Sequence, residues 1–174
     1  MEHVALNTHQ LSYLALEDPV LKTYFVGTFA GDQLPKPTSK PHGYIVNTDP
    51  HDQPGQHWIA LWPQQNVCEV MDSYGVPLET YPQAQPLRDW LKQWKYVVTN
   101  GSSLQGLYTQ TCGHYALMYL KTKARGYTLQ DFVKNFSETN RVQNDHRIGL
   151  WLKRNIVNDQ IWSCAGQQTC LRRT

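Results

Sequence analysis

Four residue types that together hydrolyse amide bonds through a thiol are spread along this chain: His57, Asp72, Gln105 and Cys112. Cysteine hydrolysis needs a thiolate nucleophile, a base, a group that orients the base, and donors for the oxyanion. Cys112 could supply the thiolate, His57 the base, and Asp72 the acceptor that fixes the imidazole tautomer. Gln105 could donate a side-chain N–H to the oxyanion, next to the backbone N–H of Cys112.

The sequence around Cys112 changes from polar to apolar. Residues 104–111 contain Gly106 and are mostly polar, whereas the chain from Tyr115 onward is apolar up to Arg125-Gly126. This pattern predicts a loop that leads into a buried helix, with Cys112 near its start. Unpaired N–H groups and the helix dipole favour a thiolate at that position. A small buried hydrophobic residue is the equally good alternative for this cysteine alone.

Two strand-like segments bring His57 and Asp72 toward each other. Residues 57–62 and 67–72 flank the four residues 63–66, so the segments predict a hairpin. If the turn closes symmetrically, paired positions sum to 129 and the two side chains are directly opposed, with Cβ atoms about 5 Å apart. A slip of one residue would place them on opposite faces of the sheet.

Each of these residues also has an ordinary structural role. His57 could be a histidine at a strand edge, Asp72 a turn former, and Gln105 a polar loop residue. His114 is a rival base for Cys112. However, it is only two positions away on the same predicted helix, and residues so spaced do not face each other.

The other elements that must hold these residues follow from periodicity. Thr8 could cap a helix that carries Leu11, Leu14 and Ala15, and Thr128 could cap a later one. The segment 57–62 is apolar on both faces, which predicts a central strand. Further segments are expected to be strands at 24–29, 43–47 and 95–99, and helices over 87–94, 129–136 and about 144–155.

Gross features favour one domain, residues 1–174, with a substantial core. No apolar run approaches the ~20 residues that span a bilayer, and the N-terminus lacks the apolar core of a signal peptide, so we expect no membrane partner and no secretion. Four cysteines do not make a disulfide scaffold at this length, which favours a reducing compartment, cytosolic or nuclear. Cys68, Cys164 and Cys170 lack zinc-ligand spacing, so no metal is expected.

Four motifs resemble the adenovirus endopeptidase (adenain) family and the related SUMO proteases. They occur in the same order as in that family: His57-Trp58, the Asp-Ser-Tyr-Gly of residues 72–75, Gln105-Gly106, and Cys112-Gly113. Residues 24–29 and 45–48 are also similar to the amino-terminal region of the adenovirus enzyme, and the resemblance covers roughly residues 11–157.

The resemblance implies a papain-like active site on an α+β fold. In that fold a central mixed or antiparallel sheet carries the nucleophile-bearing helix packed against it. It gives His57 the role of base, Asp72 that of its orienting acid, Gln105 that of oxyanion donor and Cys112 that of nucleophile. Trp58 would bind substrate by lining the cleft beside His57.

The family also suggests partners. Its adenovirus member is stimulated by DNA and by a viral peptide that it holds through a disulfide. In this sequence the corresponding stretch, residues 95–104, contains no cysteine, and the acid is Asp72 where the adenovirus enzyme has Glu. No cofactor is therefore expected to be required, while an activating peptide and weak DNA binding are implied by the resemblance alone. The net charge of +2 does not by itself indicate a nucleic-acid binder.

The sequence thus predicts a cysteine endopeptidase that cleaves viral precursor proteins at Gly-containing sites. The expected origin is a divergent adenovirus or another DNA virus, with the protein in the host nucleus and the virion. One alternative is an isopeptidase that removes ubiquitin-like modifiers. The other is a catalytically silent module that binds nucleic acid through the basic second half of the chain.

Overall fold

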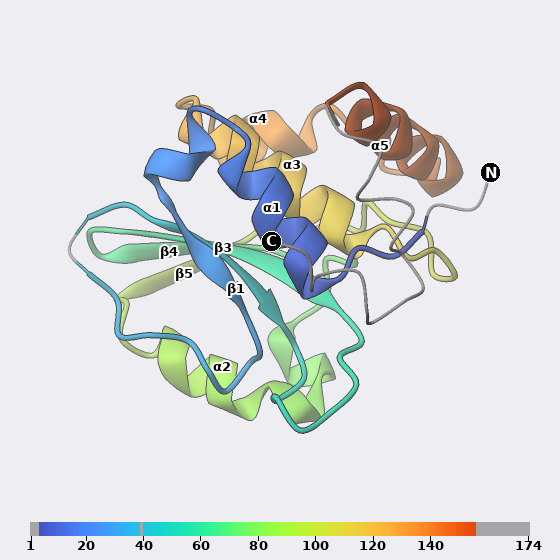
Figure 1. Cartoon of the computed structure of the whole chain (residues 1–174). Coiled ribbons are helices and arrows are strands. Elements are labelled where there is room, and N and C mark those ends of the chain that lie inside the picture. The colour runs from blue at the N-terminus through green and yellow to red at the C-terminus, as the bar shows by residue number, and fades with distance from the viewer. Residues whose placement is uncertain (1–3, 39, 156–174) are drawn as a thin grey trace, which may run out of the picture.

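The computed structural model describes residues 4–38 and 40–155, and it centres on one five-stranded mixed sheet (Figure 1). The strand order is β1-β2-β3-β4-β5, with parallel outer pairs β1/β2 and β4/β5 and antiparallel inner pairs β2/β3 and β3/β4. Cys164 and Cys170 lie outside the described residues. The strands are β1 (Phe25–Phe29), β2 (Gly43–Asn47), β3 (Trp58–Gln64), β4 (Val67–Met71) and β5 (Tyr96–Thr99).

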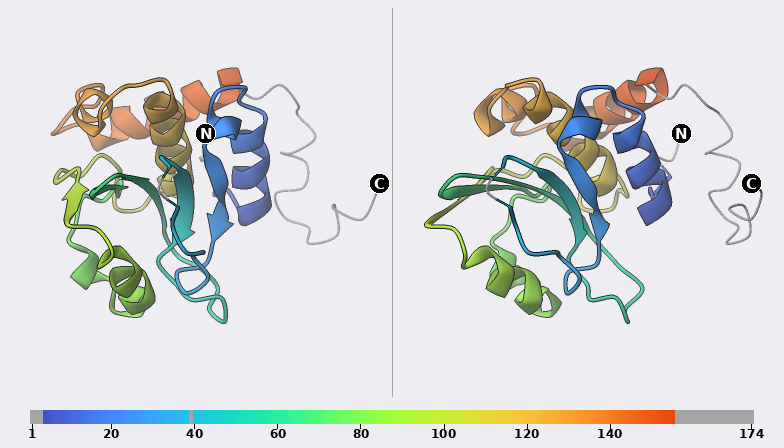
Figure 2. Two further views of the ribbon diagram at one scale, coloured as in Figure 1. Left: turned by 90° about the vertical axis from the view of Figure 1, so that its left-hand side faces the viewer. Right: turned by 60° about the vertical axis from the view of Figure 1, so that its left-hand side comes forward.

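Helices cover both faces of the sheet. Figures 1 and 2 show α1, α3, α4 and α5 on one side and α2 on the other. The α-helices are α1 (Thr8–Leu16), α2 (Gln85–Leu91), α3 (Cys112–Ala124), α4 (Leu129–Val133) and α5 (Arg141–Asn155), and the 3₁₀ turns are η1 (Leu21–Thr23), η2 (Leu78–Thr80) and η3 (Pro82–Ala84). The predicted α+β class is confirmed, and the helix that begins at Cys112 packs on the central strands.

The alternation of β3 explains this layering. Ile59 and Leu61 belong to the cluster that packs with α2, whereas Ala60 and Trp62 belong to the cluster that packs with α3 and α1. Both sets are almost fully buried, because a strand with helices on both faces has no solvent-facing side. The expected central position of this strand is confirmed.

The register of the β3/β4 hairpin differs from the prediction. Leu61 pairs with Val70 and Gln64 with Val67, so paired positions sum to 131 and not to 129. The strands continue past Pro63, and the turn is only Gln65-Asn66, with Gln65 at a φ of 54°. A two-residue hairpin turn favours such a positive φ, since this backbone follows the twist of the strands. The shift is two residues, so every side chain keeps its predicted face.

Helix boundaries differ from the predictions in smaller ways. Asn7, and not Thr8, caps α1, and it forms a capping box with Gln10. α2 ends at Leu91, before Trp94. α5 begins at Arg141, because Asn140 accepts a hydrogen bond from the backbone N–H of Gln143 and so starts the helix earlier.

The predicted cap at Thr128 is confirmed. The helix that it begins is shorter than expected, since α4 ends at Val133 and does not reach Phe136. Phe136 nevertheless packs against the core.

Candidate active site

The hairpin brings His57 and Asp72 into direct contact. His57 directly precedes β3, and Asp72 directly follows β4. His57 Nε2 lies 2.7 Å from Asp72 Oδ1, and the two residues are 4% and 2% exposed. They are not directly opposed, because in the observed register Asp72 would lie opposite Ile59. Since a two-residue shift preserves the face, the side chains still meet.

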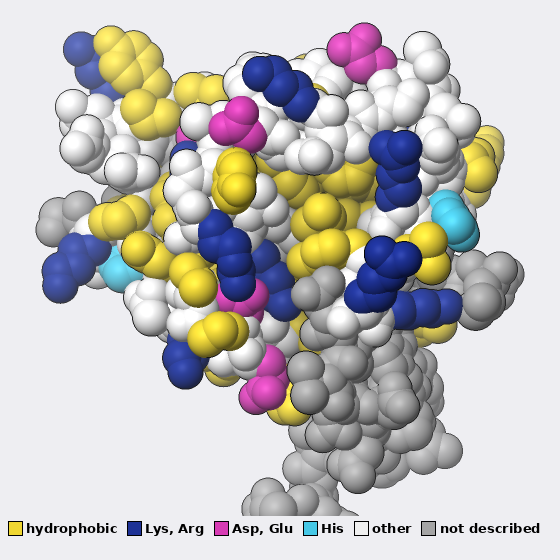
Figure 3. Space-filling model, turned by 90° about the horizontal axis from the view of Figure 1, so that it is seen from above, with side chains coloured by type: hydrophobic (Ala, Val, Ile, Leu, Met, Phe, Trp, Pro, Cys, Tyr) yellow, Lys and Arg dark blue, Asp and Glu magenta, His cyan; other side chains and the backbone are white. Residues whose placement is uncertain are grey.

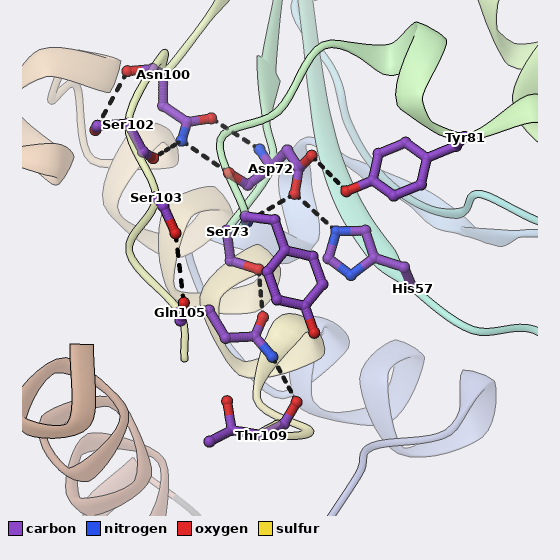
Figure 4. A network of polar contacts seen from close by, with 10 residues as sticks. His57, Asp72, Ser73, Tyr81, Asn100, Ser102, Ser103, Gln105 and Thr109 are labelled. Atoms are coloured by element: carbon purple, nitrogen blue, oxygen red, sulfur yellow. Dashed lines mark hydrogen bonds and ion pairs between the residues drawn. The ribbon is translucent and has the colours of Figure 1, made fainter. Parts of the chain in front are cut away.

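Both oxygens of the Asp72 carboxylate accept hydrogen bonds (Figure 4). Oδ1 also accepts from the backbone N–H of Tyr74 at 2.9 Å, and Oδ2 accepts from the hydroxyl of Tyr81 at 2.8 Å. The side-chain amide of Asn100 binds the backbone of Asp72 twice: its oxygen accepts from the Asp72 N–H, and its nitrogen donates to the Asp72 carbonyl. The carboxylate is thus fixed in position and orientation.

The imidazole of His57 lies between two aromatic rings. Its centroid is 4.6 Å from that of Tyr74 and 5.4 Å from that of Tyr81, and both pairs are stacked. Burial alone would lower the pKa of His57, but the hydrogen bond to Asp72 and the contact with Cys112 raise it to about 9. Burial and the neighbouring Asp72 raise the pKa of Tyr81, which therefore remains a neutral hydrogen-bond donor.

Cys112 is the first residue of α3 and is 8% exposed. Nε2 of His57 is occupied by Asp72, so Nδ1 is the ring nitrogen left for the thiol. Nδ1 has no hydrogen-bond partner among the described residues. The thiol of Cys112 is nevertheless near enough to raise the pKa of His57. A protonated imidazole next to a thiol at a helix N-terminus is the setting in which thiolate nucleophiles occur.

Gln105 is fully buried, and its amide is fixed at both ends. Oε1 accepts from the hydroxyl of Ser73 at 2.6 Å, and Nε2 donates to the carbonyl of Thr109 at 2.7 Å (Figure 4). The backbone N–H groups of Leu104 and Gln105 both donate to the carbonyl of Ser73. An amide nitrogen carries two hydrogens, so one remains for another acceptor.

A cavity of about 550 Å³ borders Cys112. Trp58 and Tyr74 line it beside the cysteine, and the polar loop of residues 47–56 forms much of its wall. The indole N–H of Trp58 donates to the carbonyl of Leu6 at 2.9 Å. This hydrogen bond holds the segment that precedes α1 against the site. Trp58 therefore lines a cavity together with Cys112, as the family resemblance implies.

Several residues of this site have no motif or spacing that predicts their role. Tyr81 and Asn100 bind Asp72, and Asp145 of α5 binds the loop before Cys112. Asn100 precedes a glycine and so has the pattern of a turn residue, while Tyr81 and Asp145 belong to no local motif. Their contacts join segments far apart in the sequence, which residue spacing does not indicate.

Within residues 4–38 and 40–155, no group of three or more His, Cys, Asp or Glu side chains could hold a metal ion. In the same part of the chain no helix has the length and apolar character needed to cross a bilayer.

The geometry defines a thiol–imidazole–carboxylate site on an α+β fold, and comparison with solved structures agrees with the fold. The chain is similar to a crystal structure of the ASFV pS273R protease, with a TM-score of 0.50, 13% identity, and coverage of 86% of this chain and 68% of that one. A selenomethionine crystal form of the same protease gives a TM-score of 0.39 and 20% identity, over 64% of this chain and 44% of that one. At this identity the likeness concerns the fold. No family model and no curated protein sequence matches the chain.

Proposed function

We propose that this protein is a cysteine endopeptidase that cleaves viral precursor proteins at Gly-containing sites. The observation that carries the proposal is the buried His57–Asp72 pair next to Cys112, at the wall of a cavity large enough for a peptide segment. The fold is also that of a viral protease. The preference for glycine and the adenain-like subtype rest on the resemblance of the four sequence motifs.

The mechanism uses groups that the site holds in place. The Cys112 thiolate attacks the scissile carbonyl carbon, and the oxyanion accepts hydrogen bonds from the N–H of Cys112 and from Gln105. His57 donates its proton to the leaving amine, which departs as the thioester forms. Water, deprotonated by His57, then hydrolyses the thioester, and the thiol is regenerated. Asp72 keeps the imidazole oriented and stabilises its cationic form.

The partners of this activity are also proposals. The substrates would be protein precursors of a DNA virus, processed in the host nucleus and the virion. An activating peptide and weak DNA binding remain part of the proposal through the family resemblance. On the face shown in Figure 3, Lys and Arg side chains are distributed among apolar and acidic ones, which fits weak rather than strong binding of DNA.

The decisive experiment compares the wild-type chain with Cys112→Ala on peptides that contain a Gly-Gly sequence. We expect turnover by the wild type and none by the variant, with nearly unchanged circular dichroism and melting, because little side-chain volume is removed. Hydrolysis that survives the substitution would exclude the thiol mechanism. Parallel assays on a conjugate of a ubiquitin-like modifier separate the endopeptidase from an isopeptidase.

A thiol probe gives an independent check without a substrate. Peptide mapping after brief alkylation should find the label on Cys112 and not on Cys68. The latter is fully buried, and burial raises the pKa of its thiol to about 12, so it is the internal control. Equal, slow labelling of the two would support a catalytically silent module.

A further inference from the structure

A single buried carboxylate from another helix fixes the loop before Cys112. Asp145 of α5 is 3% exposed, and its two oxygens accept four hydrogen bonds from residues 106–115. Oδ2 accepts from the backbone N–H of Gly106 at 2.9 Å and from the hydroxyl of Thr109 at 3.1 Å, which also lies 3.0 Å from the carbonyl of Gly106. Oδ1 accepts from the hydroxyl of Thr111 at 2.8 Å and from that of Tyr115 at 3.1 Å, which is shared with the carbonyl of Leu104.

All four donors are neutral groups. Among the described residues no ion pair involves Asp145, so these hydrogen bonds stabilise its buried charge. Hydrogen bonds to an ionised acceptor are stronger than those between neutral groups. The loop is therefore held in one conformation by an acceptor that lies outside it, 30 or more residues later in the sequence.

The contact with Thr111 fixes the residue directly before Cys112. Thr111 is the N-cap residue of α3, and its hydroxyl donates to Asp145 and does not cap the helix. The N–H of Cys112 belongs to the first turn and has no partner within its own helix, so it remains available for an oxyanion.

The contacts with Gly106 and Thr109 act on the other proposed donor. Gly106 directly follows Gln105, and the carbonyl of Thr109 accepts from Gln105 Nε2. Asp145 thus holds both the segment that carries Gln105 and the residue that orients its amide. A Cβ at Gly106 would lie 2.8 Å from Asp145 Oδ2, so the approach of this loop to the carboxylate requires glycine.

We propose that Asp145 of α5 is a positioning residue for the oxyanion site. It holds the Gln105 amide and the Cys112 N–H in fixed positions relative to each other. This inference rests on the proposed peptidase function. Asp145 touches no reacting atom; it acts through Gly106, Thr109 and Thr111.

The test measures kcat and KM of Asp145→Asn and Thr111→Val on a Gly-Gly peptide. An asparagine has one acceptor oxygen and cannot serve both pairs of donors, and valine removes one hydroxyl without changing shape or charge. We expect kcat to fall about tenfold or more, as loss of an oxyanion donor does, with KM within about twofold. In Thr111→Val the alkylation rate of Cys112 and its pH profile should be unchanged, because alkylation uses the thiolate and not the oxyanion site.

Two controls separate positioning from general destabilisation. Thr111→Ser keeps the hydroxyl and should retain the wild-type kcat. Leu152→Ala opens a cavity under α5, seven residues after Asp145, and should lower the melting temperature while leaving kcat unchanged.

The inference is overturned if both variants keep the wild-type kcat, or if kcat, alkylation rate and melting temperature fall together. Should Asp145→Asn fail to fold, Thr111→Val decides alone. An active wild type with fully active variants rejects only this inference. A wild type that hydrolyses no substrate rejects the proposed function, and this inference with it.

Discussion

At the scale of single residues, the site is built around one imidazole whose charge state the surroundings control. His57 is enclosed by the rings of Tyr74 and Tyr81, and desolvation by itself would favour its neutral form. The hydrogen bond to Asp72 and the contact with Cys112 outweigh this effect and raise its pKa to about 9. Because Tyr81 and the N–H of Tyr74 also donate to Asp72, the carboxylate is kept in the orientation that supports the imidazolium.

The first prediction at this scale concerns Asp72→Asn. The native pKa of His57 lies above the ordinary value of 6.5, so the protonated form stabilises the fold below about pH 6.5, and that contribution is lost as pH rises through about 9. Removal of the carboxylate should shift the alkaline limb of the kcat/KM profile from near pH 9 to lower pH. We also expect kcat to fall about 10²–10⁴-fold.

Tyr81→Phe is the matched control for this variant, since it removes one hydrogen bond to Asp72 and leaves the charge. Its profile should move much less than that of Asp72→Asn. If Asp72→Asn keeps full activity and an unchanged alkaline limb, Asp72 is only a turn residue.

The second residue-scale prediction concerns Gln105→Ala. The proposed role of this amide begins only when negative charge develops on the substrate oxygen, so kcat should fall while KM changes little. Steady-state kinetics on one Gly-Gly peptide measures both constants. An increase in KM at constant kcat would instead make Gln105 a substrate-binding residue.

At the scale of elements, the turn that follows β4 packs directly against the segment that carries Gln105. The N–H of Gly75 donates to the carbonyl of Asp72, and the carbonyl of Ser73 accepts from Leu104 and Gln105. Gly75 has a φ of 63°, and a Cβ there would lie 2.2 Å from the backbone of Ser102. The contact between these two loops therefore fixes Asp72 and Gln105 relative to each other.

Gly75→Ala should separate these loops. Gly101→Ala is a matched control, because Gly101 has a φ of 65° but nothing within 4 Å of its Cβ position. The control should lose about 1–2 kcal/mol of unfolding free energy, the cost of a left-handed conformation for a residue with a side chain. Gly75→Ala should lose clearly more, and its kcat should fall while that of Gly101→Ala stays near the wild type.

Chemical denaturation and kinetics on both variants test this prediction. Equal losses of stability in the two variants would show that the contact between the loops does not depend on a glycine at position 75.

At the scale of the whole molecule, the distribution of thiols limits how the proposed peptidase activity could be regulated. The strand before the Gln105 motif is β5 at the edge of the sheet, and its four residues are exposed but include no cysteine. Cys68 is fully buried on β4 and cannot reach a partner peptide. Cys164 and Cys170, the other cysteines besides Cys112, lie outside the described residues.

We therefore expect any activating peptide to bind without a covalent link, or the proposed peptidase to be substantially active alone. Turnover with and without reductant, for the wild type and a Cys164→Ser/Cys170→Ser double variant, measures this. If reductant or the double substitution removes activation by a peptide while Cys112 still reacts with a thiol probe, a disulfide tether exists and the expectation is wrong.

Local patterns in the sequence predicted the central strand, most helices and the shared face of His57 and Asp72. The apolar run of β3 predicted a central strand, since only a strand buried on both faces can be apolar throughout. The caps and periodicity predicted most helices, and the period of two along strands predicted that His57 and Asp72 share a face. These features depend on residues that are neighbours in the chain, and such interactions leave a regular spacing.

Only the tertiary structure decided which distant residues complete the site. The turn at Gln65-Asn66 is two residues long because the strands pair past Pro63, which sequence spacing alone did not distinguish from a four-residue loop. Tyr81, Asn100 and Asp145 reach the site from elements 9 to 39 residues away from their partners, with no periodic signal. Their hydrogen bonds exist because the packing of α5 against α3 and of the loops against one another excludes water, so buried donors must find acceptors within the protein.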